Sequence, residues 1–443
     1  MTESSMSENM STGRAGIARQ NTADLVRKGL RRRYAAETRF IWYGRIAIGL
    51  ALGFLVLLAG SILLQGSSAV TQTFMKLDVQ LPAEKFMQNG TVSDEAVAGA
   101  DYGGLIKAAM RDQFPEVTGR RDKRSLYELV SNGATFQLRD MVIADPSLVG
   151  QTLEVWVPAS DDIDMLNKGY IKRETEAAGR RVSDQQIAWF DTLVADGRIE
   201  SQFNTTFFTS GDSREPELAG IWGAVLGSFY TLLVTLALAF PLGVTTAVYL
   251  EEFAPKNKWT DMIEVNINNL AAVPSIIFGL LGLAVFLNVI GLPRSAPVAG
   301  GVVLALMTLP TIIIAGRAAL KAVPPSIREA ALGVGASKLQ TVTHHVLPLA
   351  MPGMLTGSII GMAQALGETA PLLMIGMVAF IVDLPGSPFD PATVLPVQVY
   401  IWADSPERAF VEKTSAGIIV LLIFLIIMNL SAVLLRRRFE RRW

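Results

Sequence analysis

The sequence contains no cysteine and only two histidines, His344 and His345, among its 443 residues. Without cysteine, the chain can form no disulfide framework, no thiolate nucleophile and no cysteine-ligated metal site. Two adjacent histidines are too few to build a metal site from imidazole ligands alone. We therefore expect this chain to bind no metal.

Charged residues and phosphate-binding motifs are also scarce. Only 18% of the residues are charged and half are hydrophobic, a composition too apolar for a soluble enzyme of this length. No G-x-x-x-x-G-K-[ST] loop, kinase signature or hydrolase signature occurs. We expect an integral membrane protein that is not an enzyme, has no catalytic residues and binds no cofactor. An energy-coupled machine built on it would use ATP and Mg²⁺ on a partner ATPase.

Six apolar runs reach the length of ~20 residues that a helix needs to cross a bilayer. They span 46–64, 221–250, 265–291, 298–315, 349–380 and 415–435. Arginine and lysine crowd both ends of the chain and also fall in the loops after the second and fourth runs, which predicts that both termini are cytoplasmic. The first run begins too far into the chain for a cleaved signal peptide and is expected to be an uncleaved anchor, with cleavage near 67–69 as the alternative.

This count divides the chain into five parts. They are a basic cytoplasmic segment (1–40), a first transmembrane helix (41–65), a periplasmic domain (66–215), a core of five further transmembrane helices with a cytoplasmic loop at 317–348 (216–435), and a basic cytoplasmic tail (436–443).

The periplasmic domain is expected to be α+β. Its pattern is strand-like at 74–81, 153–157 and 199–209 and helical at 93–114, 124–131 and 183–196. Its charged residues show no metal or catalytic spacing. This favours a structural or docking domain over a sensor or a substrate relay.

The segment 326–348, SIREAALGVGASKLQTVTHHVLP, is semi-polar and lies between two apolar runs. Pro324 and Pro325 are expected to end the preceding helix. Ser326 and Glu329 have the spacing of a capping box, which predicts a short helix that begins at Ile327.

A second short helix is expected after a turn. Gly333 and Gly335 can adopt positive φ at low cost, so they predict the turn. Ser337 and Gln340 repeat the capping pattern, and Pro348 is expected to limit the second helix. The whole segment is predicted to be a helix–turn–helix elbow.

Three interpretations of the elbow remain open on its residues. The first is a plain connecting hairpin. The second, a DNA-binding helix–turn–helix, is disfavoured because apolar spans lie within about ten residues on both sides and few cations are present to contact phosphates. The third is a coupling elbow that lies in a groove of a cytoplasmic ATPase.

Several motifs resemble those of known permeases. Glu329, Ala330, Ala331 and Gly335, followed by Leu347 and Pro348, resemble the EAA loop of binding-protein-dependent ABC importer permeases, although His345 stands where that family usually has isoleucine. The stretches 268–286, 367–373 and 395–407 resemble phosphate permeases of the PstA family. Together they cover most of residues 221–435.

The resemblance implies an all-α membrane protein of type I ABC importer (MetI-like) architecture in the bacterial inner membrane, with the α+β domain as an unusual insertion. It implies phosphate import by alternating access, with a PstC-like permease, two PstB-like ATPase subunits and a PstS-like periplasmic binding protein as partners. No nucleic acid partner is expected. The coupling loop would consist of Ser326, Glu329, Ala330, Ala331, Gly335, Leu347 and Pro348.

Candidate residues for the transport path are polar groups within the apolar runs. An unpaired charge at membrane depth costs ~2.5 to 3.5 kcal/mol or more, so Glu368 is the leading functional candidate. We expect it to pair with an arginine or to take part in gating rather than to touch phosphate. Related permeases carry an arginine where this chain has Gln364, so Arg317 or the partner permease would have to supply any cation that the path needs.

Helix breaks offer a second source of positive potential, because the backbone amides at a helix N-terminus point at anions. We expect breaks at Gly367 with Pro371 and at Pro274 with Ser275. The hydroxyls of Ser275 and Thr369 could then hydrogen-bond a dehydrated anion, or could hold helices together.

Two alternative functions remain. One is a permease for another oxyanion, such as molybdate or sulfate. The other is a membrane signalling protein whose periplasmic domain senses and whose elbow binds an effector.

Overall fold

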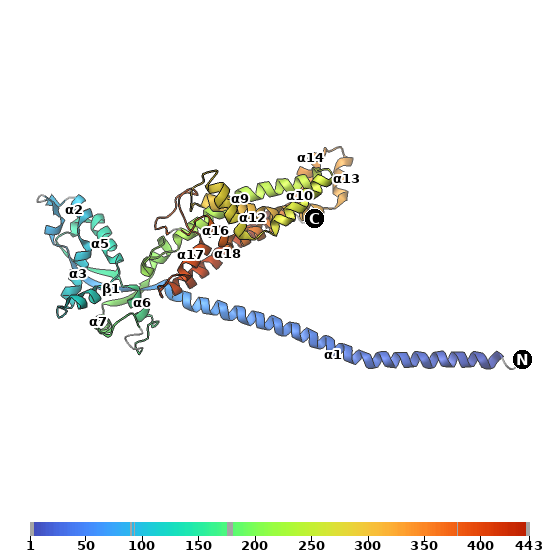
Figure 1. The fold of residues 1–443 in the computed structure, drawn as a ribbon, viewed down its shortest axis with the longest axis horizontal. Helices are drawn as coiled ribbons and strands as arrows, with labels where there is room; N and C mark the ends of the chain where they lie inside the picture. The colour runs from blue at the N-terminus through green and yellow to red at the C-terminus, as the bar shows by residue number, and fades with distance from the viewer. Residues whose placement is uncertain (1–3, 89–90, 93, 175–179, 379, 440–443) are drawn as a thin grey trace. The chain divides into compact units, whose positions relative to one another are not determined.

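A computed structural model describes residues 4–88, 91–92, 94–174, 180–378 and 380–439 (Figure 1). The ends of the expected basic segments, 1–3 and 440–443, lie outside the described residues, as do positions 93 and 379 of the expected helices. The chain forms two compact units, Met1–Ile62 and Leu63–Trp443. The first unit is helical and consists of most of α1 (Ser4–Ser67), which contains the first apolar run.

The second unit contains a helical bundle and a mixed sheet and helix region. The helices of the bundle region are α9 (Trp222–Val248), η6 (Tyr249–Phe253), α10 (Lys258–Ala271), α11 (Ser275–Leu281), η7 (Gly282–Leu287), α12 (Pro297–Lys321), α13 (Pro325–Gly333), α14 (Lys338–Gln340), η8 (Thr341–Val346), α15 (Leu347–Gly367), α16 (Ala370–Met374), α17 (Leu395–Ala403) and α18 (Phe410–Phe439). Among the described residues, five helices are long and apolar enough to cross a membrane, and a sixth crossing results if the bent pair of α10 with α11 and η7 counts as one.

The third apolar run, 265–291, is not one straight helix, as the break expected at Pro274 with Ser275 predicts. The axes of α10 and of α11 with η7 differ by 103°. Pro274 has an extended backbone, with ψ at 136°, at the junction. A proline disfavours the helical conformation of the residue before it and cannot donate a backbone hydrogen bond, so the helix breaks there.

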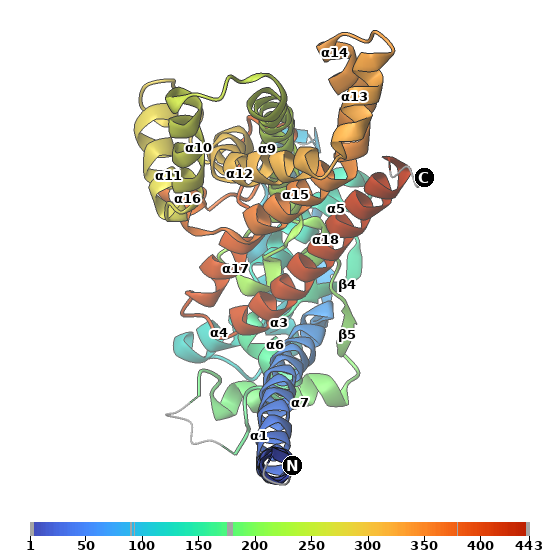
Figure 2. The same cartoon turned by 90° about the vertical axis from the view of Figure 1, so that its right-hand side faces the viewer.

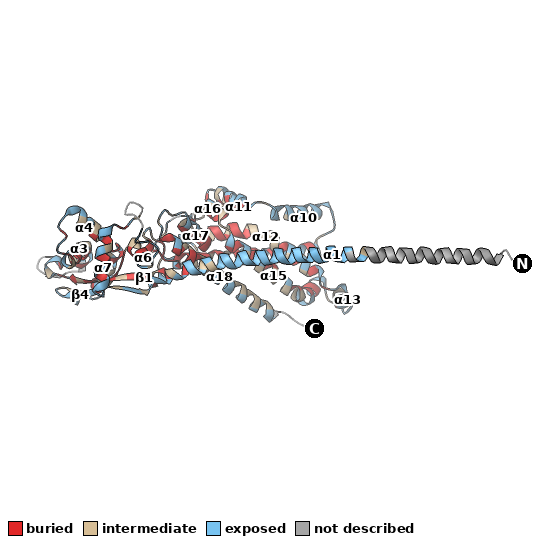
Figure 3. Ribbon diagram, turned by 90° about the horizontal axis from the view of Figure 1, so that it is seen from below, coloured by how far each residue is buried: buried red, intermediate tan, exposed pale blue. Residues whose placement is uncertain are grey.

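Small residues let the central helices approach closely. A Cβ atom added at Gly243 on α9 would lie 2.6 Å from Ile312 on α12, and one added at Gly316 on α12 would lie 2.8 Å from Ala247 on α9. Close approach of backbones through small residues is the usual packing of membrane helices. By contrast, α10 has no buried residue (Figure 3).

The mixed region is built on a three-stranded antiparallel sheet in which β1 lies between β4 and β5. In its register, Leu77 pairs with Val155, and Met75 pairs with Ile199. Its elements are η1 (Ser68–Val70), β1 (Thr71–Gln80), η2 (Ala83–Phe86), β2 (Met87–Gln88), β3 (Thr91–Val92), α2 (Asp94–Gly99), α3 (Tyr102–Gln113), α4 (Arg120–Tyr127), α5 (Gly133–Ala144), η3 (Pro146–Leu148), β4 (Thr152–Pro158), α6 (Asp161–Asn167), α7 (Asp184–Ala195), β5 (Ile199–Phe203), α8 (Thr205–Thr209) and η5 (Pro216–Leu218).

The expected strands at 74–81 and 153–157 are confirmed as β1 and β4, and the helix at 183–196 is confirmed as α7. The strand expected over 199–209 is half wrong, because the strand ends at Phe203 and α8 follows. The Asn204 side chain accepts a hydrogen bond from the Phe207 amide at 3.0 Å and so caps α8. The helix expected near 93–114 is interrupted, since Asp101 caps α3 through the Gly104 amide at 2.8 Å.

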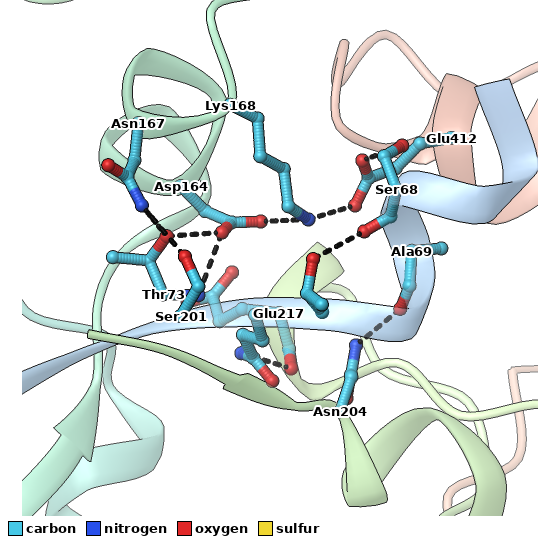
Figure 4. Close-up of polar contacts among 12 residues, drawn as sticks. Ser68, Ala69, Thr73, Asp164, Asn167, Lys168, Ser201, Asn204, Glu217 and Glu412 are labelled. Atoms are coloured by element: carbon cyan, nitrogen blue, oxygen red, sulfur yellow. Dashed lines mark hydrogen bonds and ion pairs between the residues drawn. The ribbon is translucent and has the colours of Figure 1, made fainter. Parts of the chain in front are cut away.

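A buried ionic network ties the mixed region to the first turn of α18 (Figure 4). The ammonium group of Lys168 lies 2.7 Å from a carboxylate oxygen of Asp164 and 2.7 Å from one of Glu412. The three side chains are at most 10% exposed. Ser68 donates to the other oxygen of Glu412 at 2.7 Å, and the Thr73 amide donates to Asp164 at 2.8 Å. Each charge therefore has a partner in a region of low solvent access.

Replacement of Lys168 by methionine is expected to lower the free energy of unfolding by about 3 kcal/mol, because two buried carboxylates lose their common cation. Thermal unfolding of the purified full chain, followed by tryptophan fluorescence, measures the change. The matched control is Lys172→Met, which removes an exposed cation shortly after Lys168 in the sequence. This substitution should change the free energy of unfolding by less than about 0.5 kcal/mol. Equal effects of the two substitutions would contradict a stabilising role of the network.

Candidate coupling elbow and transport path

The elbow lies at the end of the bundle opposite the mixed region (Figure 1). Its first helix, α13, begins at Pro325 rather than at Ile327, and the expected capping box of Ser326 and Glu329 is wrong. Pro324 is the N-cap residue and contributes no side-chain hydrogen bond. Proline suits the first helical position, because its φ is already helical and its missing N–H would have had no partner there. Ser326 therefore lies inside the first turn.

The turn of the elbow confirms half of the expectation. Gly335 has a φ of +90°, whereas Gly333 is the last residue of α13 and keeps a helical φ. The Ala336 amide donates to the Ala331 carbonyl at 3.1 Å, and the Gly335 amide donates to the Leu332 carbonyl at 3.0 Å. These two bonds form a Schellman motif, which needs the left-handed residue that glycine supplies.

The second arm of the elbow is the start of the fifth span. The capping box is confirmed here, since the Ser337 amide donates to the Gln340 side chain at 2.9 Å and the Gln340 amide donates to the Ser337 hydroxyl at 3.3 Å. The helix then continues from Lys338 to Gly367, so the expectation that Pro348 limits a short helix is wrong. A π-helical turn, η8, directly precedes α15, and Pro348, which has no backbone N–H to donate, is the second residue of α15.

The tip of the elbow exposes apolar side chains. Val334 is 86% exposed, Leu339 61% and Leu332 51%, whereas Ala331 is buried. Figure 2 shows α13 and α14 projecting at the edge of the bundle. Of the coupling-loop candidates, Glu329 and Ala330 are exposed, and Leu347 and Pro348 are partly buried. Exposed apolar side chains gathered at one place are typical of an interaction surface. The motif pointed to Glu329 and Ala330, and sequence reasoning missed Leu332 and Val334.

Both expected helix breaks are confirmed. The helix α15 ends at Gly367, and α16 begins at Ala370, while α10 ends at Ala271 and α11 begins at Ser275. The two breaks belong to neighbouring elements, because α11 packs on α16. A Cβ atom added at Gly279 on α11 would lie 2.6 Å from the Cα atom of Pro371 on α16.

Glu368 lies in the second break and is partly buried. The expected arginine partner is not found, since no ion pair or hydrogen bond of its carboxylate occurs within the described part of the chain. The physical reason is that α11, α15 and α16 carry no lysine or arginine. Thr369 is the N-cap residue of α16, and Ser275 is the first residue of α11. Gln364 is exposed one turn before the break.

Arg317 lies at the end of α12, and its guanidinium group already binds two carboxylates. Its Nη2 atom is 2.6 Å from Glu264 on α10, and its Nε atom is 3.4 Å from Glu251 on η6. The Arg317 side chain is 16% exposed. In this conformation Arg317 joins three elements and offers no unpaired positive charge to an anion.

The mixed region buries carboxyl groups beside a cavity of about 400 Å³. Burial raises the pKa of Glu217 to about 7, although a hydrogen bond from Ser131 opposes the change. Burial and the neighbouring Asp162 raise the pKa of Asp161 to about 6. No group of three or more histidine, aspartate or glutamate side chains within the described ranges could hold a metal ion.

These carboxyl groups predict a pH-dependent stability of the mixed region. In the native state the carboxyl group of Glu217 keeps its proton up to a pH of about 7, whereas in an unfolded chain it loses the proton near pH 4.5. The native state therefore binds more protons between these values, and its stability falls as the pH rises through them. We expect Glu217→Gln to reduce this fall. Hydrogen exchange of the β1 amides, corrected for the intrinsic pH dependence of exchange, measures the stability of the mixed region at each pH.

The control for this prediction is Glu215→Gln. Glu215 is only partly buried and accepts a hydrogen bond from Asn132 at 3.2 Å. The pH dependence should persist in this variant. A pH dependence that is the same in Glu217→Gln as in the unchanged chain would contradict the assignment to Glu217.

Comparison with known proteins identifies the class of this chain. Residues 239–443 match the family model described as the binding-protein-dependent transport system inner membrane component, and residues 27–177 match a domain of unknown function, DUF3333. A probable ABC transporter permease protein of Bacillus subtilis, YqgI, is 30% identical over 260 residues, which cover 56% of this chain and 87% of the relative. The chain therefore belongs to the binding-protein-dependent ABC transporter permeases.

Within that class the chain is similar to phosphate permeases. The phosphate transport system permease protein PstA 1 of Mycobacterium tuberculosis H37Rv is 32% identical over 223 residues, which cover 50% of this chain and 71% of the relative. The chain is a PstA-like ABC permease with an additional N-terminal domain. Among solved structures, an inward-facing MetNI methionine ABC transporter covers 50% of this chain and 98% of its own, at 21% identity and a TM-score of 0.41.

Proposed function

We propose that this permease subunit moves inorganic phosphate into the cell by alternating access. The observation that supports the substrate is the similarity to phosphate permeases over half of the chain. Both helix breaks lie within residues 239–443, which match the permease family model. A break at membrane depth exposes backbone amides and hydroxyl groups to a dehydrated anion. The candidates for contact with the path are Ser275, Gln364, Glu368 and Thr369, and Arg317 remains a candidate only if its carboxylates release it.

The proposed topology has six crossings, with the bent pair α10 and α11 as the third. Both termini and the elbow are then cytoplasmic, and the mixed region lies in the periplasm. The arginines at 436–438, which end α18, and the cations Arg328 and Lys338 of the elbow support this orientation, because cytoplasmic loops are rich in lysine and arginine.

A binding-protein-dependent permease works with an ATPase and a substrate-binding protein. We propose a PstC-like second permease, two PstB-like ATPase subunits and a PstS-like binding protein. Trp259, Met262 and Val265 of α10 are exposed and would be covered by the second permease. The exposed tip of the elbow would seat on the ATPase, which binds ATP and Mg²⁺. The proposed docking follows the helix-in-groove mode of recognition, in which apolar side chains of a helix enter a groove.

Phosphate uptake by the complex reconstituted in vesicles tests the substrate. We expect ATP-dependent uptake of phosphate that is not reduced by an excess of molybdate or sulfate. Uptake of molybdate or sulfate in preference to phosphate would contradict phosphate as the substrate, while the chain would still be a permease. Absence of ATP-dependent uptake of all three, with the ATPase bound, would favour a signalling role.

A further inference from the structure

The helix α9 ends in a π-helical turn, η6, that carries two consecutive glutamates, Glu251 and Glu252. Consecutive residues of a helical turn point in different directions, so the two carboxylates can reach different neighbours. Glu251 lies 3.4 Å from Arg317 and 3.7 Å from Lys321, both on α12. Glu252 instead faces the elbow. Single π turns within longer helices often occur at functional positions.

Arg328 on α13 binds Glu252 with the Nε and Nη2 atoms of its guanidinium group. Its Nη2 atom is 2.6 Å from one carboxylate oxygen, and its Nε atom is 3.2 and 3.4 Å from the two oxygens. The Glu252 side chain is 8% exposed and that of Arg328 is 24% exposed. Two-point binding between a planar guanidinium group and a carboxylate fixes orientation as well as distance.

The same guanidinium group also holds the end of α12. Its Nη1 atom donates to the Val323 carbonyl at 2.8 Å, and its Nη2 atom donates to the Leu320 carbonyl at 2.9 Å. The Leu320 carbonyl, in the last turn of α12, also accepts a hydrogen bond from the Val323 amide at 3.2 Å, and the Val323 carbonyl lies just after the end of α12. Arg328 therefore joins α13, the end of α12 and the end of α9 through one rigid group.

The second arm of the elbow contacts the same turn. The ammonium group of Lys338 on α14 lies 5.2 Å from the centre of the Phe253 ring. A cation at this distance from an aromatic face is attracted to it. Both arms of the elbow thus contact η6, and η6 also contacts α12 through Glu251. A displacement of the elbow can therefore be transmitted directly to α9 and α12 through the contacts at η6.

We propose that the pair of Glu252 and Arg328 is the positioning contact that transmits movement of the elbow to α9 and α12. Arg328 is a positioning residue, since it acts through the helices rather than on the substrate. The inference rests on the proposed function, because it needs an ATPase that moves the elbow. The inference also identifies the contact within this chain that links the elbow to α9 and α12. The exposed tip of the elbow provides no such link.

The test uses the complete complex in vesicles and measures ATP hydrolysis and substrate uptake in the same preparation. Glu252→Gln keeps the shape of the side chain and removes its charge. Arg328→Lys keeps the charge and loses the two-point contact. Each substitution removes the charge-assisted two-point contact, so we expect the uptake per ATP hydrolysed to fall about tenfold or more in each variant. ATP hydrolysis and the amount of bound ATPase should remain.

Lys256→Gln is the matched control, because Lys256 is an exposed cation three residues after η6. Its ratio of uptake to hydrolysis should equal that of the unchanged complex. An unchanged ratio in Glu252→Gln and Arg328→Lys would overturn the inference and leave the proposed function intact. Loss of the bound ATPase in both variants would also overturn it, because the pair would then support assembly. Failure of the unchanged complex to take up phosphate would instead refute the proposed function.

Discussion

Replacement of Glu329 by lysine is expected to abolish ATP-driven phosphate uptake while the amount of chain in the membrane stays the same. Glu329 is exposed on α13, and its carboxylate has no hydrogen bond or ion pair within the described residues. Substitution of such a surface residue should change the stability of the fold by less than about 0.5 kcal/mol. At an interface, by contrast, juxtaposed like charges cost several kcal/mol. Phosphate uptake and the membrane content of the chain are measured together.

Glu329→Gln is the control that separates loss of the negative charge from its reversal. We expect a smaller loss of uptake in this variant, because an uncharged amide repels no cation on the partner. Normal uptake in Glu329→Lys would remove Glu329 from the coupling surface.

Reversal of charge at Glu368 is the second substitution with a large expected effect. Glu368→Lys should reduce uptake at least about tenfold without displacing the ATPase, because the 21-residue helix α15 separates the break between α15 and α16 from the elbow. The carboxylate is partly buried, and no cation pairs with it within the described chain. A partly buried charge without a partner is costly, so we propose that Glu368 acts in gating or contacts the partner permease.

Uptake kinetics and the ATPase that co-purifies with the chain are the two measurements for Glu368. Glu368→Gln is the control, since it keeps the shape of the side chain and removes the charge. Unchanged kinetics in Glu368→Lys would make the residue merely structural. Loss of the ATPase would show that the effect begins at the elbow rather than in the path.

Local features of the structure follow from the sequence where one residue type decides the backbone. Gly335 supplies the left-handed residue of the elbow turn, Ser337 and Gln340 cap its second arm, and Pro274 breaks the third run. The alternation of apolar and polar residues in β1 also predicts the strand, because one face of β1 is buried. In each case the deciding interaction lies within a few residues.

The errors lie where two local signals competed. At α13, a proline at the first helical position outweighed the capping box of Ser326. At Pro348, the preceding π turn allowed the helix to continue. After Phe203, the Asn204 cap started a helix that the apolar pattern had presented as strand.

Contacts across long sequence distances could not be predicted. Arg317 was expected as an available cation, but it binds Glu251 and Glu264 from two other elements. The pairing of Lys168 with Glu412 joins residues that are 244 positions apart. No periodicity or motif carries information on such pairs, because they depend on how the elements pack.

Cross-linking from the elbow tests the central claim, that this surface seats on an ATPase. The chain has no cysteine, so Ala330→Cys or Val334→Cys introduces one reactive thiol at an exposed position. Gly335 is unsuitable, because its φ of +90° would strain a side chain. Phe136→Cys, in the mixed region and 59% exposed, is the control. Our account predicts that both elbow positions capture the ATPase in intact cells and that position 136 does not; failure of both elbow positions to capture it would contradict the account.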